Sequence, residues 1–211
     1  KSDFYIVEEE DPEVCVDKIV ELFRRFIPQR FKLDPLNDVQ LLTPMQRGGL
    51  GARALNETLQ NALNHRDDRV ERFGAFYGDG DKIMQVMNNY DKEVFNGDIG
   101  KILHVDREER QLIVQFGNRR VEYDFNELDE LLPAFAITIH KSQGSEYPCV
   151  VIPLHTQHFV MLQRNLLYTA VTRGKKLVIL VGPKKAIAMA LNRADTGERR
   201  TALKERLETT L

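Results

Sequence analysis

The sequence predicts an α/β fold in which one parallel sheet, covered by helices on both faces, is interrupted by a small antiparallel β-barrel. Strand and helix patterns alternate up to about residue 66 and resume after residue 133, which is typical of a parallel sheet. Between them, short segments of alternating polar and apolar residues are separated by turn sequences, which is typical of antiparallel strands. We therefore expect one sheet with an insertion.

The first part of the chain begins with a strand and a long helix. Phe4–Val7 has the composition of a short strand, and Asp11 with Pro12 forms a helix start, with Asp as the N-cap and Pro at the first helical position. Apolar residues then recur with helical spacing up to Ile27, and we expect Pro28 to end this helix. Three elements follow: a strand at 39–42, a loop at 43–51 and a helix at 52–63.

The middle part predicts strands alone, whereas the last part predicts both strands and helices. The middle part predicts strands at 82–87, 99–105, 111–116 and 120–125, separated by turns such as Asn96-Gly97 and Gly117-Asn118. The last part predicts strands at 134–139, 149–153 and 177–181, helices at 160–173 and 183–192, and a charged final helix from Arg193. We expect domain boundaries at 1–68, 69–133 and 134–211, the middle segment being of the size of a compact barrel.

Composition limits the classes of protein that the chain can be. Hydrophobic residues make up 42% and charged residues 29% of the 211 residues, and the net charge of −2 does not itself indicate a nucleic-acid partner. No apolar run approaches the ~20 residues of a membrane span, so we expect no membrane partner. Cys15 and Cys149 lie in apolar patterns and predict core residues of a reduced, cytoplasmic protein. Because the chain starts at Lys1, we expect a piece of a longer protein.

Two segments place polar groups directly after apolar runs. Phe135, Ile137 and Ile139 alternate as in a buried strand, and polar residues crowd onto the turn that follows. In open α/β sheets, ligands bind at the carboxyl ends of strands, so we expect a site at this turn. The second segment, residues 165–174, predicts a helix that carries Arg173 at its end.

These two segments closely resemble motifs V and VI of superfamily 1 helicases, in the form found in RecD-like DNA helicases, which include the exodeoxyribonuclease V alpha subunit. The matching runs are Thr-x-His-Lys-Ser-Gln-Gly-x-Glu from Thr138 and Leu-Tyr-Thr-Ala-x-Thr-Arg from Leu167. Residues 42–48 and 80–100 add to a resemblance that covers nearly the whole chain. It implies the C-terminal motor domain of an ATP-dependent 5′-to-3′ DNA helicase, a second RecA-like domain interrupted by an SH3-like barrel.

The resemblance also implies a role for four residues toward ATP. Arg173 would reach the γ-phosphate as an arginine finger, since a guanidinium is always charged and binds phosphoryl oxygens with two donors. Gly144 would let the backbone approach the nucleotide, Glu146 would accept from a ribose hydroxyl, and Gln143 would bridge phosphate and DNA. The residues alone leave two alternatives open, a helix-terminal cation for Arg173 and an ordinary polar turn for 143–146.

Eight residues are candidates for contacts with single-stranded DNA. Thr138, His140, Lys141 and Ser142, at the end of the strand at 134–139 and just after it, offer hydroxyl, imidazole and ammonium groups that suit a phosphodiester backbone. Thr43 and Arg47, on a second loop, offer further phosphate contacts. Tyr90 and Asn96, in the barrel, offer an aromatic ring and an amide that suit bases. The alternatives are a histidine that holds the turn in shape for His140, a flexible surface loop for Thr43 and Arg47, and core packing for the aromatic residues of the barrel. For the neighbouring Phe95 we prefer core packing.

The chain carries only half of an ATPase site. No Gly-x-x-x-x-Gly-Lys-Ser/Thr run and no upstream Asp-Glu pair occur in it, so ATP and Mg²⁺ would be bound mainly by an N-terminal RecA-like domain of the same polypeptide. We expect the fragment to be inactive alone, with no metal site of its own. Recombination or repair subunits are further expected partners. Two alternatives stay open: the helicase part of a conjugative relaxase or an RNA-directed superfamily 1 helicase, and a non-catalytic nucleic-acid-binding module.

Overall fold

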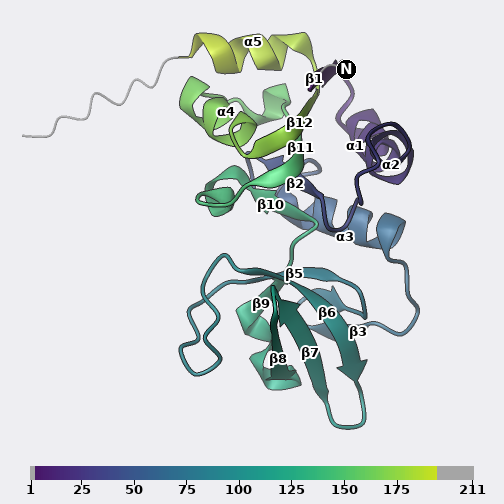
Figure 1. The fold of residues 1–211 in the computed structure, drawn as a ribbon. Coiled ribbons are helices and arrows are strands. Elements are labelled where there is room, and N and C mark those ends of the chain that lie inside the picture. Colours follow the sequence, from purple (N-terminus) through teal and green to yellow (C-terminus); the bar gives the residue numbers. More distant parts are fainter. Residues whose placement is uncertain (1–2, 194–211) are drawn as a thin grey trace, which may run out of the picture.

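The computed structural model describes residues 3–193, and Figure 1 shows a parallel sheet with a second, antiparallel sheet beside it. The five strands of the parallel sheet lie in the order β1-β12-β11-β2-β10. Their bounds are β1 (Phe4–Val7), β2 (Val39–Thr43), β10 (Ala136–Thr138), β11 (Tyr147–Pro153) and β12 (Gly174–Val181). Two of these strands precede the middle part of the chain and three follow it, which confirms a parallel sheet with an insertion.

Helices cover both faces of this sheet because its central strands are apolar on both sides. In β11, Cys149 and Val151 pack with α1 (Pro12–Glu21) and α3 (Ala52–Leu63), whereas Val150 and Ile152 pack with α4 (Arg164–Val171) and α5 (Lys184–Asn192). Cys15, in α1, packs in the same apolar cluster as Cys149. Both cysteines are therefore buried, as expected, and both are free thiols.

The first helix continues beyond Pro28, contrary to our expectation. A π-helical turn, η1 (Leu22–Phe26), separates α1 from α2 (Ile27–Phe31), and Lys32 ends the run with a φ of 60°. Proline normally breaks a helix because it lacks an N–H and its ring meets the carbonyl four residues earlier. Here Ile27 N–H bonds to Leu22 O, five residues back, and the wider turn accommodates the proline that follows.

The inserted sheet has the order β8-β7-β6-β5-β9, with antiparallel pairing throughout. Its strands are β5 (Lys82–Gln85), β6 (Ile99–Asp106), β7 (Gln111–Phe116), β8 (Arg119–Asp124) and β9 (Leu131–Pro133), and a 3₁₀ helix, η2 (Phe125–Glu130), joins the last two. The sequence predicted the first four strands. It missed β9 and the hairpin of β3 (Val70–Arg72) and β4 (Ala75–Tyr77), because three residues are too few to show a period of two.

In the last part, β11 and β12 start two and three residues earlier than predicted, whereas two other elements are shorter than predicted. The strand expected at 134–139 ends at Thr138 and continues as a 3₁₀ turn, η3 (Ile139–Ser142). The helix expected at 160–173 is α4, which starts only at Arg164, after a short 3₁₀ turn, η4 (Thr156–His158). The helix expected from Arg193 lies outside the described residues. Within residues 3–193, no helix has the length and apolar character needed to cross a membrane.

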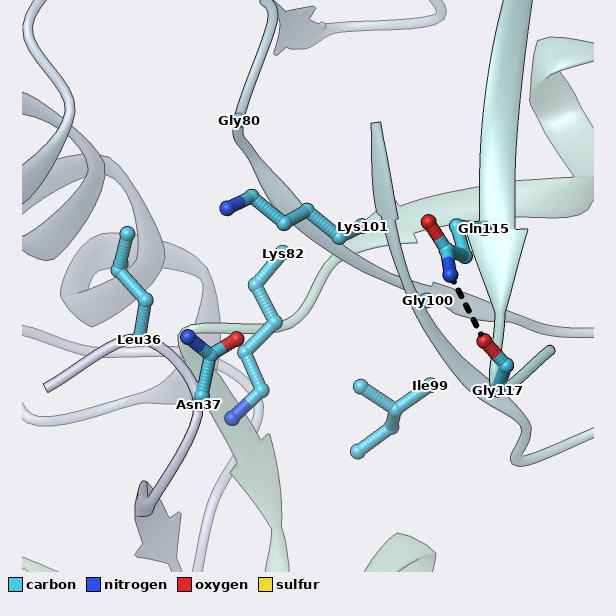
Figure 2. A pocket seen from close by; sticks show the side chains of 9 residues that line it. All are labelled: Leu36, Asn37, Gly80, Lys82, Ile99, Gly100, Lys101, Gln115 and Gly117. Atoms are coloured by element: carbon cyan, nitrogen blue, oxygen red, sulfur yellow. Dashed lines mark hydrogen bonds between the residues drawn. The ribbon is translucent and has the colours of Figure 1, made fainter. Parts of the chain in front are cut away.

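Lys82 joins the two sheets at the base of the insertion. Its side chain is buried, with 8% exposed, and its ammonium donates to Val39 O at 3.2 Å and lies 5.8 Å from the centre of the Tyr147 ring. Figure 2 shows the cavity of about 350 Å³ at this junction, into which Lys82 and Lys101 extend from the inserted sheet, opposite Asn37. Burial lowers the pKa of Lys82 from 10.5 to about 8, against the opposing charges of Asp34 and Asp38.

Lys82 should make the stability of the chain depend on pH. Below about pH 8, folded and unfolded chains both carry its proton; between about pH 8 and 10.5, the unfolded chain holds a proton that the folded chain has released. The free energy of unfolding should therefore rise with pH across this range, by about 1–3 kcal/mol. Urea denaturation at a series of pH values should show that Lys82→Met lacks this rise and that Lys101→Met, which alters an exposed lysine of the same cavity, retains it. Parallel curves for the wild type and Lys82→Met would contradict the prediction.

Candidate nucleotide and nucleic-acid interface

The parallel sheet brings two predicted loops together at its carboxyl edge. Strands β2 and β10 are neighbours, and their last residues, Thr43 and Thr138, are paired in register. The loop at 44–51 and the η3 turn therefore leave the sheet side by side. An interaction across the edge supports β10: the Asn56 side chain accepts from Ala136 N at 2.9 Å and donates to Ala136 O at 2.7 Å, as a neighbouring strand would.

Two of the expected DNA contacts do not agree with the structure. Thr43 and Ser142 are fully buried, and their hydroxyls donate to Leu50 O at 2.6 Å and to Ile139 O at 2.7 Å, respectively. These bonds hold the shape of the two loops, so neither side chain is placed to reach a phosphate. The sequence could not show this, because a hydroxyl after a strand serves equally well inside a turn or outside it.

The other candidates on these loops face solvent. His140, Lys141, Gln143 and Arg47 are exposed, and Thr138 is half-buried. Gly144 has a φ of +85°, which favours glycine, and a Cβ added there would meet no atom within 4 Å. The backbone at Gly144 is therefore open to a ligand.

A cleft connects this turn to the inserted sheet. It has a volume of about 520 Å³. His140, Lys141 and residues 143–145 line one part of it, and Asn96, Gly97 and Asp98 line another. The carboxylate of Asp98 accepts from Phe95 N at 2.9 Å and so belongs to the turn of its own loop. Donors of the η3 turn and the Asn96 amide therefore share one cavity, although they are far apart in the sequence.

Aromatic side chains lie on the same barrel loop. Tyr90 is 74% and Phe95 is 45% exposed, and their rings meet edge to face with centres 6.0 Å apart. Our preference for core packing of Phe95 was therefore wrong. The core of the inserted sheet is filled by other side chains, among them Tyr77, Tyr123 and Phe125, which leaves Phe95 at the surface.

Arg173 follows α4 and is held by the turn at 143–146. Its guanidinium donates to Thr169 O at 3.3 Å, to Ser145 O at 3.1 Å and to Thr172 Oγ1 at 3.4 Å, and the side chain is half-buried. Its own carbonyl accepts from Tyr147 N at 2.8 Å. The ends of the two motif segments are thus joined through this arginine.

Glu146 lies beside this arginine at the start of β11. Its carboxylate pairs with Lys175 at 2.9 Å, and this hydrogen bond, with added attraction from Arg173, lowers the pKa of Glu146. The side chain is about half exposed, so it keeps lone pairs for another donor. Among the residues that the structure describes, no group of three or more His, Cys, Asp or Glu side chains is arranged to hold a metal ion.

Both parts of the fold match known families. Residues 133–181 match the UvrD-like helicase C-terminal domain, and residues 55–116 match the SH3 domain of ATP-dependent RecD-like DNA helicases. The chain is 39% identical over 169 residues to the ATP-dependent RecD2 DNA helicase of Deinococcus radiodurans, and 34% identical over 172 residues to the RecBCD enzyme subunit RecD of Haemophilus influenzae. This chain belongs to the RecD-like helicases.

The RecD-like chain is much shorter than these relatives. The two matches cover 80% and 82% of the chain but only 23% and 25% of the relatives. Among solved structures, a Pif1 helicase from Bacteroides in complex with ADP-AlF3 and ssDNA aligns with a TM-score of 0.57 over 96% of this chain and 54% of that one. At 14% identity, this likeness shows a shared fold.

Two residues with structural roles near the site were not among the predicted site residues. Asn56 supports the edge strand from α3, and Lys82 ties the insertion to β2; each acts on a backbone atom more than forty residues away. A polar residue in an otherwise apolar pattern was the available signal for Lys82, at the start of a predicted strand. Its partner could be known only from the fold.

Proposed function

We propose that this chain is the C-terminal motor domain of an ATP-dependent DNA helicase, in which it supplies an arginine finger and contacts to single-stranded DNA. The observation that carries the proposal is the cleft in which His140, Lys141 and residues 143–145, from the η3 turn and the segment after it, meet residues 96–98 of the loop before β6. Phosphate donors on one wall and a loop with exposed aromatic rings on the other suit the backbone and the bases of one strand.

On the nucleotide side, the proposal assigns Arg173, Gln143, Gly144 and Glu146 to ATP held mainly, with Mg²⁺, by an N-terminal RecA-like domain of the same polypeptide. The residues present fit a nucleotide: a half-buried guanidinium, an open glycine backbone and a half-exposed carboxylate lie at one end of the sheet. Hydrolysis of ATP to ADP and phosphate would supply the free energy for movement. Arg173 would stabilise the charge that develops during that step.

On the DNA side, the proposal assigns His140, Lys141, Thr138 and Arg47 to phosphates, and Tyr90 with Asn96 to bases. Opening and closing of the two domains around ATP would move the DNA contacts of one relative to the other. The family resemblance supports 5′-to-3′ movement. The RecBCD names of several relatives support recombination or repair subunits as partners.

Tyr90 provides a test of DNA binding by the barrel. Because its ring is largely exposed and meets the Phe95 ring edge to face, Tyr90→Ala should weaken binding of single-stranded DNA by about 1–3 kcal/mol with little effect on folding. Tyr90→Phe keeps the ring and should bind normally. Titration of a labelled oligonucleotide followed by fluorescence anisotropy measures both.

Other outcomes of this titration would change the proposal. If Tyr90→Ala and the wild type bind DNA with equal affinity, the barrel loop does not contact DNA through Tyr90. Tighter binding of an RNA of the same sequence would instead favour an RNA-directed helicase.

A further inference from the structure

A second cavity adjoins the η3 turn. It has a volume of about 150 Å³, and His140 and Gln143 line both this cavity and the larger cleft. Its remaining lining comes from α4 and the residues before it, including Met161, Gln163 and Thr169. A strand that crosses the turn with its phosphates near His140 and Lys141 therefore passes the mouth of this cavity.

Polar groups of the cavity are available to a ligand. Among residues 3–193, the side-chain amides of Gln143 and Gln163 have no hydrogen-bond partner, and each carries a donor and an acceptor. Thr169 Oγ1 donates to Asn165 O at 2.8 Å, which leaves its oxygen able to accept. Gln163 is the N-cap of α4 and makes no capping bond, so its amide is not needed to start that helix.

The rest of the lining is apolar or neutral. Met161 and Leu166 contribute apolar surface, and among residues 3–193 no lysine, arginine, aspartate or glutamate lines the cavity. A phosphate would find no fixed positive charge there. A nucleobase, by contrast, has apolar faces and an edge of hydrogen-bond donors and acceptors, which is the combination that this small cavity offers.

We propose that this cavity receives a single nucleobase, with Gln143 and Gln163 bonded to its edge and Met161 against its face. The inference rests on the proposed function, because the η3 turn is what brings a strand to the cavity. The base can belong to single-stranded DNA or to a free nucleotide, and the two sources are separated by experiment.

The test compares three probes on the full 211-residue chain. The probes are a short oligodeoxynucleotide, an abasic oligomer of the same length, and AMP. The wild type should bind the base-bearing oligomer at least about 10-fold more tightly than the abasic one. Gln163→Ala should lower that preference by about 5-fold, as expected for the loss of a hydrogen bond to the base. Gln157→Ala, which removes an exposed amide outside the cavity, should leave the preference unchanged.

The probes distinguish failure of this inference alone from failure of the proposed function. If the chain binds both oligomers and Gln163→Ala has the preference of the wild type, the nucleobase site is overturned while DNA binding stands. Saturable AMP binding that Gln163→Ala weakens, with no change in oligomer preference, would assign the cavity to the base of a nucleotide. If neither oligomer nor AMP binds, the DNA-binding function and this site both fail.

Discussion

Replacing Arg173 with alanine in the longer protein is expected to slow ATP hydrolysis by a factor of ~10³–10⁵ while nucleotide affinity changes little. The expectation follows from the position of the guanidinium, which is half-buried and bound to Ser145 O and Thr169 O beside the turn that we assign to the nucleotide. Such an arginine acts mainly on charge that appears in the transition state, so its loss affects the rate more than binding.

Arg173→Lys should not restore the rate, because an ammonium cannot reproduce two parallel donors. Arg24→Ala is a suitable control, since Arg24 is an exposed arginine of the η1 turn, remote in sequence from both motif segments. Steady-state hydrolysis and binding of a labelled nucleotide should be measured on the same preparations. If Arg173→Ala hydrolyses ATP at nearly the rate of the wild type, Arg173 is not an arginine finger. Its role would then be structural, as a cation at the end of α4 that holds the 143–146 turn in place.

Gly182→Ala is expected to destabilise the fold by on the order of 4 kcal/mol. Gly182 follows β12 with a φ of +144°, which side chains rarely adopt, and an added Cβ would lie 1.9 Å from Leu154 O. Gly182 and Leu154 follow the ends of the neighbouring strands β12 and β11, where Leu154 N bonds to Val181 O. Neither segment can move away without breaking the sheet.

Gly49→Ala is the matched control, because its Cβ would meet no atom within 4 Å and its φ is not in the left-handed region. Urea denaturation should give Gly49→Ala a free energy of unfolding close to that of the wild type. A similar value for Gly182→Ala would show that the chain relaxes at the end of β12 more easily than the geometry indicates.

Much of the fold could be predicted from the sequence because its signals are local. The period of two in β7 and the helical period of α3 identified these elements with their observed bounds, and Asp11 with Pro12 marked the start of α1. The helix across Pro28 could not be predicted in this way, since the π-helical turn depends on how that segment packs against the sheet. Three-residue strands were missed for a similar reason: β9 is a strand only because β5 lies beside it.

The sequence by itself determined which polar groups flank the elements of the sheet: His140, Lys141 and Gln143 follow a predicted strand, and Arg173 ends a predicted helix. Only the tertiary structure decided which of these groups face a ligand. Thr43 and Ser142 are buried, Phe95 is exposed, and Asn96 shares a cleft with the η3 turn. The physical reason is that a side chain's type sets what it can bind, whereas its exposure and its neighbours follow from contacts between segments far apart in the chain, as between Lys82 and Val39 or Asn56 and Ala136.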